Sequence, residues 1–401
     1  MITENRRARA HVDWPLILMV AAISLFGVLA VCVATYTPES TAENLLGHIV
    51  ESSSTLRQCF FLLVAPVVVL VIMNIPFDLM RRATELVYYG ATALITVVWV
   101  FNRAEGVKQW LDIIWGFTIQ PTEFAKLAMI LMLAKQLSRV DRPLGTIREF
   151  VQLMLTVLVP GAIILLSGET GSLLVIIFLC AVMMYFSNVD MRLLLSLAAA
   201  VVLMVLALYG FMVATGSDDY RLARILAFIN PELSPSGDAY QMLQSQMAIG
   251  SGGLTGIGTF VDGSMSQLNY VPADWTDFIY ATIGEAWGFV GCFAILVWYL
   301  MIILRMVYLA AFTRDKYGML IITGVIGMLL FHVFENIGMA LGLMPITGIP
   351  LPFLSYGGSN MVTNMGGIAL VLNVTKNRSL SGSVLTPQTR VNPYTFGRRV
   401  R

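Results

Sequence analysis

The chain has 401 residues, of which 57% are hydrophobic and only 12% are charged. Soluble domains carry about 25% charged residues, so this composition excludes an ordinary soluble protein and indicates an integral membrane protein. The formal net charge is +1, and no nucleic-acid partner is predicted. The four cysteines all lie in apolar runs without CxxC spacing, which argues against disulfides and against bound zinc or iron–sulfur clusters.

Ten apolar runs follow one another along the chain. A run needs about 20 residues to cross a bilayer, or somewhat fewer inside a bundle. We therefore predict an all-α integral membrane protein with about ten transmembrane helices. The runs lie near residues 14–36, 57–76, 86–101, 123–137, 149–166, 171–188, 191–214, 277–304, 318–343 and 353–375. They form one membrane domain, residues 14–375, between tails at 1–13 and 376–401.

The distribution of Lys and Arg among the loops predicts that both termini are cytoplasmic. On this assignment the outer loops hold few cations, namely Arg103, Lys108, Arg221 and Arg224. One long extracytoplasmic loop, residues 215–276, joins the seventh and eighth helices and carries many of the acidic residues. Within it, "YRLARILAFI" at 220–229 predicts a short amphipathic helix on the membrane surface.

The glycine-rich stretch "GSGGLTGIG", residues 250–258, fits neither dinucleotide-binding nor P-loop spacing, because Thr259 stands where a P-loop needs lysine. We interpret it as a flexible or tightly turning loop. "SYGGSN" at 355–360 does not meet the GxSxG pattern of a nucleophile elbow.

Several polar residues lie within or beside apolar runs, where they are costly and are usually retained for a use. Asp277 stands at the start of the eighth run, with Glu285 two helical turns inside it. Glu123 and Lys126 are three residues apart on one helix face, and form either the wall of a polar cavity or a structural ion pair.

The ninth run carries His332, Glu335 and Asn336, which share one helix face. We expect these three side chains to point inward and to hydrogen-bond between helices.

Five motifs together resemble those of one family. They are "QPTEFAK", "YRLARILAFINPE", "YQMLQSQMAIGSGGLTGIG", "TDFIYATIGE" and "GLMPITGIPLPFLSYGGS". In this order and context the chain resembles the shape, elongation, division and sporulation (SEDS) family of RodA and FtsW, and is more similar to the RodA branch. The resemblance covers about residues 57–375.

The resemblance implies a multi-pass protein of the bacterial cytoplasmic membrane with a ten-helix fold. It implies a peptidoglycan glycosyltransferase that polymerises lipid II, the undecaprenyl-diphosphate-linked disaccharide-peptide, on the outer membrane face. The implied partners are lipid II, a class B penicillin-binding transpeptidase and membrane lipids.

The same resemblance assigns roles to individual residues. The catalytic aspartate of the family's TDFI motif maps to Asp277. The predicted substrate-binding residues are Glu123, Lys126, Arg221, Arg224, Lys108, Trp110, Gln244, Ser245, Ser355, Tyr356, Gly357, Gly358 and Ser359. The chain departs from the family pattern at Gln109, at Glu169 and at Ala286.

The chemistry needs a base and a stabiliser of the leaving diphosphate. A carboxylate at the membrane–water boundary, such as Asp277, can accept the proton of the attacking sugar hydroxyl. One carboxylate suffices for an inverting transfer, because a diphosphate leaves without a protonating acid. Arg221 and Arg224, with Arg57, Lys108 and Lys126 as alternatives, can stabilise the diphosphate. No metal-binding residue is predicted, and a divalent cation, Mg²⁺ or Mn²⁺, is the alternative stabiliser.

Two other functions stay open on the sequence. Polar residues inside the membrane, such as Glu123, Glu169 and Glu335, are compatible with a lipid II flippase. The departures at Gln109 and Glu169 are compatible with an inactive scaffold that recruits the transpeptidase.

Overall fold

A computed structural model describes residues 12–37, 40, 44–102, 110–112, 118–139, 146–214, 224, 228 and 237–381. Within these residues the elements are α1 (Trp14–Ala34), α2 (Leu45–Glu51), α3 (Ser53–Met73), α4 (Phe77–Asn102), β1 (Leu111–Asp112), β2 (Thr118–Ile119), α5 (Pro121–Ser138), α6 (Ile147–Leu166), α7 (Thr170–Phe186), α8 (Met191–Ala214), α10 (Asp238–Ser251), α11 (Ile279–Ala311), α12 (Lys316–Ala340) and α13 (Gly358–Ser381).

A helix lies at each of the ten predicted apolar runs. Among the described helices, α1, α3, α4, α6, α11 and α12 are long and apolar enough to cross a membrane, and α7 and the first part of α8 are shorter apolar helices. α5 and α13 do not meet these criteria. α5 carries three charged residues, Glu123, Lys126 and Lys135, and α13 contains several asparagines.

The described residues add three details to the prediction. Within the predicted outer loop 215–276, residues 238–251 form α10. The last helix, α13, extends to Ser381. The otherwise helical chain contains one short antiparallel pair, β1–β2, with Leu111 opposite Ile119. Of the predicted amphipathic helix at 220–229, the structure describes only Arg224 and Phe228, both in helical conformation.

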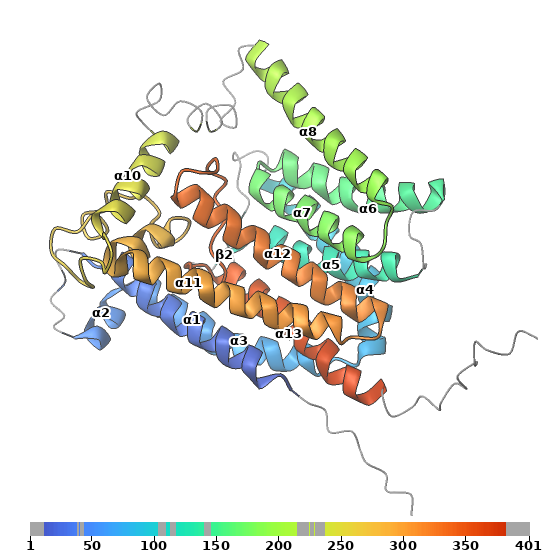
Figure 1. Cartoon of the computed structure of the whole chain (residues 1–401), viewed down its shortest axis with the longest axis horizontal. Coiled ribbons are helices and arrows are strands. Elements are labelled where there is room, and N and C mark those ends of the chain that lie inside the picture. Colours follow the sequence, from blue (N-terminus) through green and yellow to red (C-terminus); the bar gives the residue numbers. More distant parts are fainter. Residues whose placement is uncertain are drawn as a thin grey trace, which may run out of the picture.

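α12 is the central helix of the bundle. It packs against α5, α7, α11 and α13, and most of its side chains are buried. Figure 1 shows α1, α11 and α12 running side by side, while α8 contacts α7 and leans away from the rest. Apolar side chains of the outer helices remain exposed, as expected where lipid replaces water.

The start of α1 is held by a single acidic residue. The Oδ1 atom of Asp13 caps the helix by accepting the Leu16 N–H at 3.0 Å. Its Oδ2 atom also pairs with the guanidinium of Arg305 on α11, at 2.7 Å. One carboxylate therefore caps the start of α1 and also fixes this helix to α11.

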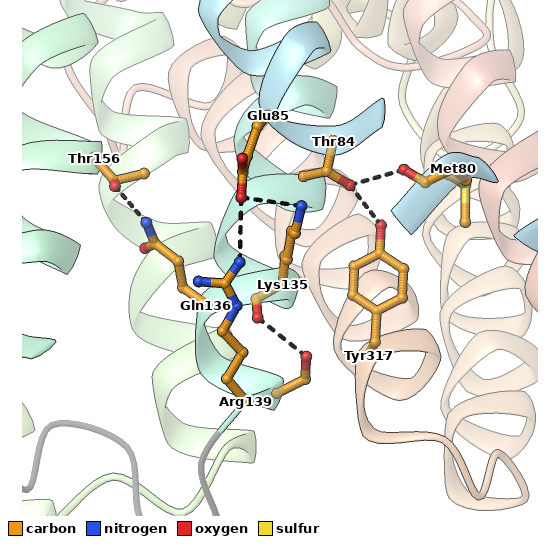
Figure 2. Close-up of polar contacts among 9 residues, drawn as sticks. Met80, Thr84, Glu85, Lys135, Gln136, Arg139, Thr156 and Tyr317 are labelled. Atoms are coloured by element: carbon orange, nitrogen blue, oxygen red, sulfur yellow. Dashed lines mark hydrogen bonds and ion pairs between the residues drawn. The ribbon is translucent and has the colours of Figure 1, made fainter. Parts of the chain in front are cut away.

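A second polar cluster joins α4, α5, α6 and α12 (Figure 2). Glu85 pairs with Lys135 at 3.0 Å and with Arg139 at 3.2 Å. The hydroxyls of Thr84 and Tyr317 lie 2.9 Å apart in the buried part of the same region. The ion pairs link α4 to the end of α5 and, being partly exposed, contribute about 0–1 kcal/mol each. The buried hydroxyl pair links α4 to α12.

The glycine-rich loop packs against α11 where that helix is broken. Gly288 has non-helical backbone angles, φ 64° and ψ −161°. Around the break, the N–H groups of Ile257 and Gly258 donate to the carbonyls of Glu285 and Ala286. A Cβ on Gly256 would lie 2.1 Å from the Ala286 oxygen, so glycine is required there. The predicted turning loop therefore satisfies backbone groups that the broken helix leaves unpaired.

Candidate functional site

Most of the predicted polar residues meet at one cavity. It has a volume of about 480 Å³. It lies between the starts of α5 and α7, the residues just before α11, and the segment that leads from α12 into the start of α13. Its wall is formed by Trp110, Gln120, Glu123, Lys126, Gly168, Glu169, Gly171, Ser172, Arg224, Thr276, Asp277, Thr347, Gly348, Ile349, Pro350, Tyr356, Gly357, Ser359 and Asn360.

Asp277 lies just outside α11, two residues before its first residue. The side chain is partly buried and faces the cavity. Burial raises the pKa of Asp277 to about 6, and the positive charge of Arg224 opposes this rise. A carboxyl group with a pKa of about 6 is mostly ionised at neutral pH. Because this pKa is close to neutral pH, the group can both accept and release a proton there.

Two hydrogen bonds fix the backbone on either side of this carboxyl group. The side-chain amide of Asn336 on α12 donates to the Asp277 carbonyl at 2.6 Å. The N–H of Tyr356 donates to the Trp275 carbonyl at 2.9 Å. Both partners come from other segments, so the position of Asp277 depends on α12 and on the start of α13.

Glu123 and Lys126 on α5 combine the two alternatives left open by the sequence, because they form a buried ion pair and also line the cavity. Lys126 Nζ lies 2.7 Å from Glu123 Oε1, and the side chains are only 1% and 3% exposed. The same ammonium group lies 3.0 Å from His332 Nε2 on α12. The remaining oxygen, Glu123 Oε2, has no hydrogen-bond partner among the described residues. The pair therefore forms part of the cavity wall with its charged groups almost completely buried.

The segment before α13 forms another wall. Gln58 on α3 donates to the Ser355 carbonyl at 3.2 Å and accepts the Gly357 N–H at 3.4 Å. Ser359 Oγ accepts the Gln120 N–H at 3.0 Å, which joins this wall to the start of α5. These contacts hold Tyr356 and Gly357 at the cavity.

Two glycines let backbone segments approach one another here. Gly348 has φ +69°, and a Cβ there would lie 3.4 Å from Asp277 Oδ2. A Cβ on Gly171 would lie 2.9 Å from the Thr347 oxygen. No sequence pattern identifies these two positions, because the packing partner of a glycine becomes visible only when distant segments are placed together.

Glu169 is a cavity residue that the sequence analysis did not include among the substrate-binding residues. It precedes α7, is buried, and its pKa is raised by burial. Its Oε2 atom has no hydrogen-bond partner in the described part of the chain. Its carboxyl group therefore belongs to the cavity wall, at a position where the chain departs from the family pattern.

The residues singled out from the sequence fall into four groups. The cavity wall includes Trp110, Glu123, Lys126, Arg224, Asp277, Tyr356, Gly357 and Ser359. Ser355 and Gly358 lie behind that wall, where Ser355 Oγ accepts the Leu351 N–H and Gly358 packs on Phe61. Gln244 and Ser245 lie on α10, where Ser245 donates to the Ala340 carbonyl, and neither lines the cavity. Lys108, Gln109 and Arg221 lie outside the described residues.

Glu285 is separate from this cavity. Its carboxylate accepts the N–H groups of Met265 and Ser266, at 2.6 and 3.0 Å, and the Ser266 hydroxyl at 2.6 Å. It thus orders the segment before Asp277 rather than facing a ligand.

A second cavity, of about 340 Å³, lies beside the end of α1 and the start of α3. Tyr36, His48, Ser52 and Trp275 are among the residues that line it. None of the predicted site residues does, so the first cavity is the candidate functional site.

Three comparisons relate the chain to known proteins. The family model of FtsW, RodA and SpoVE, described as "Cell cycle protein", matches residues 13–380. Stage V sporulation protein E of Bacillus subtilis is 33% identical over 324 residues, which are 80% of this chain and 86% of that protein. Peptidoglycan glycosyltransferase MrdB of Escherichia coli K12 is 29% identical over 379 residues, 94% of this chain and 97% of that one.

Two solved structures superpose on most of the chain. A chain of a peptidoglycan synthase complex that coordinates polymerization and crosslinking superposes with a TM-score of 0.73 at 26% identity, over 92% of this chain and 98% of that one. The rod shape determining protein RodA of Thermus thermophilus gives a TM-score of 0.65 at 27% identity, over 92% and 97%.

Proposed function

We propose that this chain, which belongs to the FtsW/RodA/SpoVE family of cell cycle proteins, is a peptidoglycan glycosyltransferase that polymerises lipid II in the cytoplasmic membrane. Curated relatives over nearly the whole length carry the name peptidoglycan glycosyltransferase. The observation that carries the proposal is the presence of Asp277, Lys126 and Arg224 in the wall of one cavity. A base and two cations are the groups that this transfer requires.

In the proposed reaction the Asp277 carboxylate removes the proton from the attacking hydroxyl of one lipid II sugar. The hydroxyl oxygen forms a bond to the anomeric carbon of the second lipid-linked sugar, with inversion at that carbon. The bond from that carbon to the diphosphate oxygen breaks, and its electron pair leaves with the diphosphate. Lys126 and Arg224 stabilise the charge that develops there, and the burial of Lys126 strengthens its share of this stabilisation.

A divalent cation, Mg²⁺ or Mn²⁺, is compatible with this scheme. Among the described residues, no group of three or more His, Cys, Asp or Glu side chains is placed to hold a metal ion. Such a cation would therefore be held mainly by the diphosphate of the substrate, and no step of the proposal passes through it.

The proposed topology has ten transmembrane helices, both termini in the cytoplasm, and the cavity facing the outer side. This orientation supplies the undecaprenyl tails from the membrane and the head groups from outside the cell. A class B penicillin-binding transpeptidase is the proposed partner, supported by the likeness to a complex that couples polymerization to crosslinking.

The test is polymerisation of purified lipid II, with the partner transpeptidase present where it is needed. Asp277→Asn removes the base and keeps the shape of the side chain, and we expect glycan polymer to be lost while the protein stays folded. Polymer formed by this variant at the parental rate would remove Asp277 from the mechanism. Movement of lipid II across vesicles without polymer would instead favour a flippase, and neither activity would favour a scaffold.

A further inference from the structure

His332 lies behind the cavity wall and touches one of its cations. Its Nε2 atom is 3.0 Å from Lys126 Nζ, and the histidine is fully buried. Lys126 lines the cavity, whereas His332 does not. Any influence of His332 on a ligand must therefore pass through the lysine.

The contact fixes the form of the histidine ring. An ammonium group only donates hydrogen bonds, so Nε2 must be the acceptor and the ring proton must be on Nδ1. A charged imidazolium would put two positive groups 3.0 Å apart with no water between them, which is strongly unfavourable. His332 is therefore neutral while Lys126 is charged.

The histidine gives the lysine a second acceptor without adding negative charge. Lysine is a point charge on a flexible four-carbon stem with three donors. Among the described residues, two of these donors go to Glu123 and His332, which leaves the third for a ligand in the cavity. If Glu123 were the only hydrogen-bond partner of Lys126, the ammonium group could rotate toward the Glu123 carboxylate and would not be held in its present position. A second carboxylate in place of His332 would make the cluster negative and oppose a diphosphate.

We propose that His332 is a positioning residue for Lys126, and that it holds the ammonium where it stabilises the leaving diphosphate of the substrate. The inference rests on the proposed glycosyltransferase function. It assigns His332 the role of a neutral hydrogen-bond acceptor, with no transfer of a proton.

The test compares two substitutions in the purified protein, with lipid II as substrate. His332→Gln keeps a neutral acceptor that can reach Lys126, and His332→Leu removes it. We expect His332→Leu to lower kcat about ten-fold to one-hundred-fold, the usual effect of losing a hydrogen bond to a charged group, with a smaller change in KM. His332→Gln should retain kcat within about three-fold of the parent, because one acceptor replaces another.

Thr323→Val provides the matched control. Thr323 is a buried polar residue of the same helix, its hydroxyl donates to the Met319 carbonyl at 2.8 Å, and it does not line the cavity. This variant should lower the melting temperature without changing kcat per folded molecule. The same melting measurement on the His332 variants separates a loss of folded protein from a loss of catalysis.

Each outcome has one meaning. Equal kcat for His332→Leu and the parent would overturn the inference. A folded His332→Gln protein as slow as His332→Leu would also overturn it, because the acceptor alone would not then explain the role. A parent protein that makes no polymer, with its partner present, would contradict the proposed function instead.

Discussion

The backbone carbonyl of Asp277 accepts a 2.6 Å hydrogen bond from the side-chain amide of Asn336. The same amide nitrogen donates its second hydrogen to the Ile349 carbonyl at 2.8 Å. One buried side chain of the central helix therefore joins the segment before α11 to the segment after α12, and both segments line the cavity.

Replacing Asn336 by leucine, which has a similar volume but no hydrogen-bond donor, should weaken this link between the two segments. Two buried carbonyls would lose their partner, at a cost of about 1–3 kcal/mol each, and Asp277 would be less well placed. We expect kcat for polymerisation to fall at least about ten-fold. Asn373→Leu is the control, because Asn373 bridges the carbonyls of Ile72 and Ile75 away from the cavity. It should lose stability and keep kcat per folded molecule, and equal kcat losses in both variants would contradict a specific role for Asn336.

The pH dependence of polymerisation should report the ionisation of Asp277. A general base acts only when ionised, and burial raises the pKa of this carboxyl to about 6. The rate should therefore fall about ten-fold per pH unit below about pH 6 and level off above it. Arg224→Gln removes a cation that lowers this pKa, so the acidic limb should move to higher pH. Profiles of kcat/KM against pH, which report the ionisation of the free enzyme, would measure both, and a parental profile that is flat between pH 5 and 7 would contradict the assignment.

The same carboxyl should reduce stability when it is ionised. Its pKa rises from 3.8 to about 6 on folding, so the folded state favours the protonated form. Stability from this group is fully present below pH 3.8 and is lost as the pH rises through about 6. Asp277→Asn should therefore raise the melting temperature above pH 6, by about 2 °C or more, with little change near pH 3.8. A variant that melts below the parent at pH 8 would show that the carboxylate is stabilising.

Gly348→Ala should impair the reaction without unfolding the protein. The substitution places a methyl group in the cavity wall, in van der Waals contact with Asp277 Oδ2 at 3.4 Å, where it takes up space beside the carboxylate that an incoming hydroxyl needs. Alanine at φ +69° is also strained by about 1 kcal/mol. Gly263→Ala is the control, because Gly263 has φ +82° with no atom within 4 Å of an added Cβ. Both variants should lose similar stability, and only Gly348→Ala should lower kcat, by about ten-fold. Equal kcat values for the two variants would mean that a methyl group beside the carboxylate has no effect on the reaction.

Much of this site could be predicted from the sequence, because the patterns that identify its residues are local. The three-residue spacing of Glu123 and Lys126 places both on one helix face, and the apolar run after Asp277 places that carboxyl at a helix start. The resemblance to the SEDS family is confirmed by the family-model match over residues 13–380.

What the sequence could not supply depends on contacts between distant segments. Gln58 meets the Ser355–Gly357 segment almost three hundred residues later, and no local pattern encodes that contact. α10 had a local signal that was missed, since Ala239, Met242, Ser245 and Ala248 are buried at three-residue spacing. Polar residues between them made the segment look like part of a loop.

The break at Gly288 divides α11 into two parts, and the glycine-rich loop is hydrogen-bonded to both of them. The loop donates to the carbonyls of Glu285 and Ala286 before the break, and it accepts the N–H groups of Phe289 and Val290 after the break. The second part runs on to Ala311 with many side chains exposed. Helices respond to a thicker or thinner bilayer by tilting. Because the loop holds the two parts together, we expect a tilt of the longer part to be passed on to the reactive end of α11, so that membranes of different thickness change the geometry around its carboxylate.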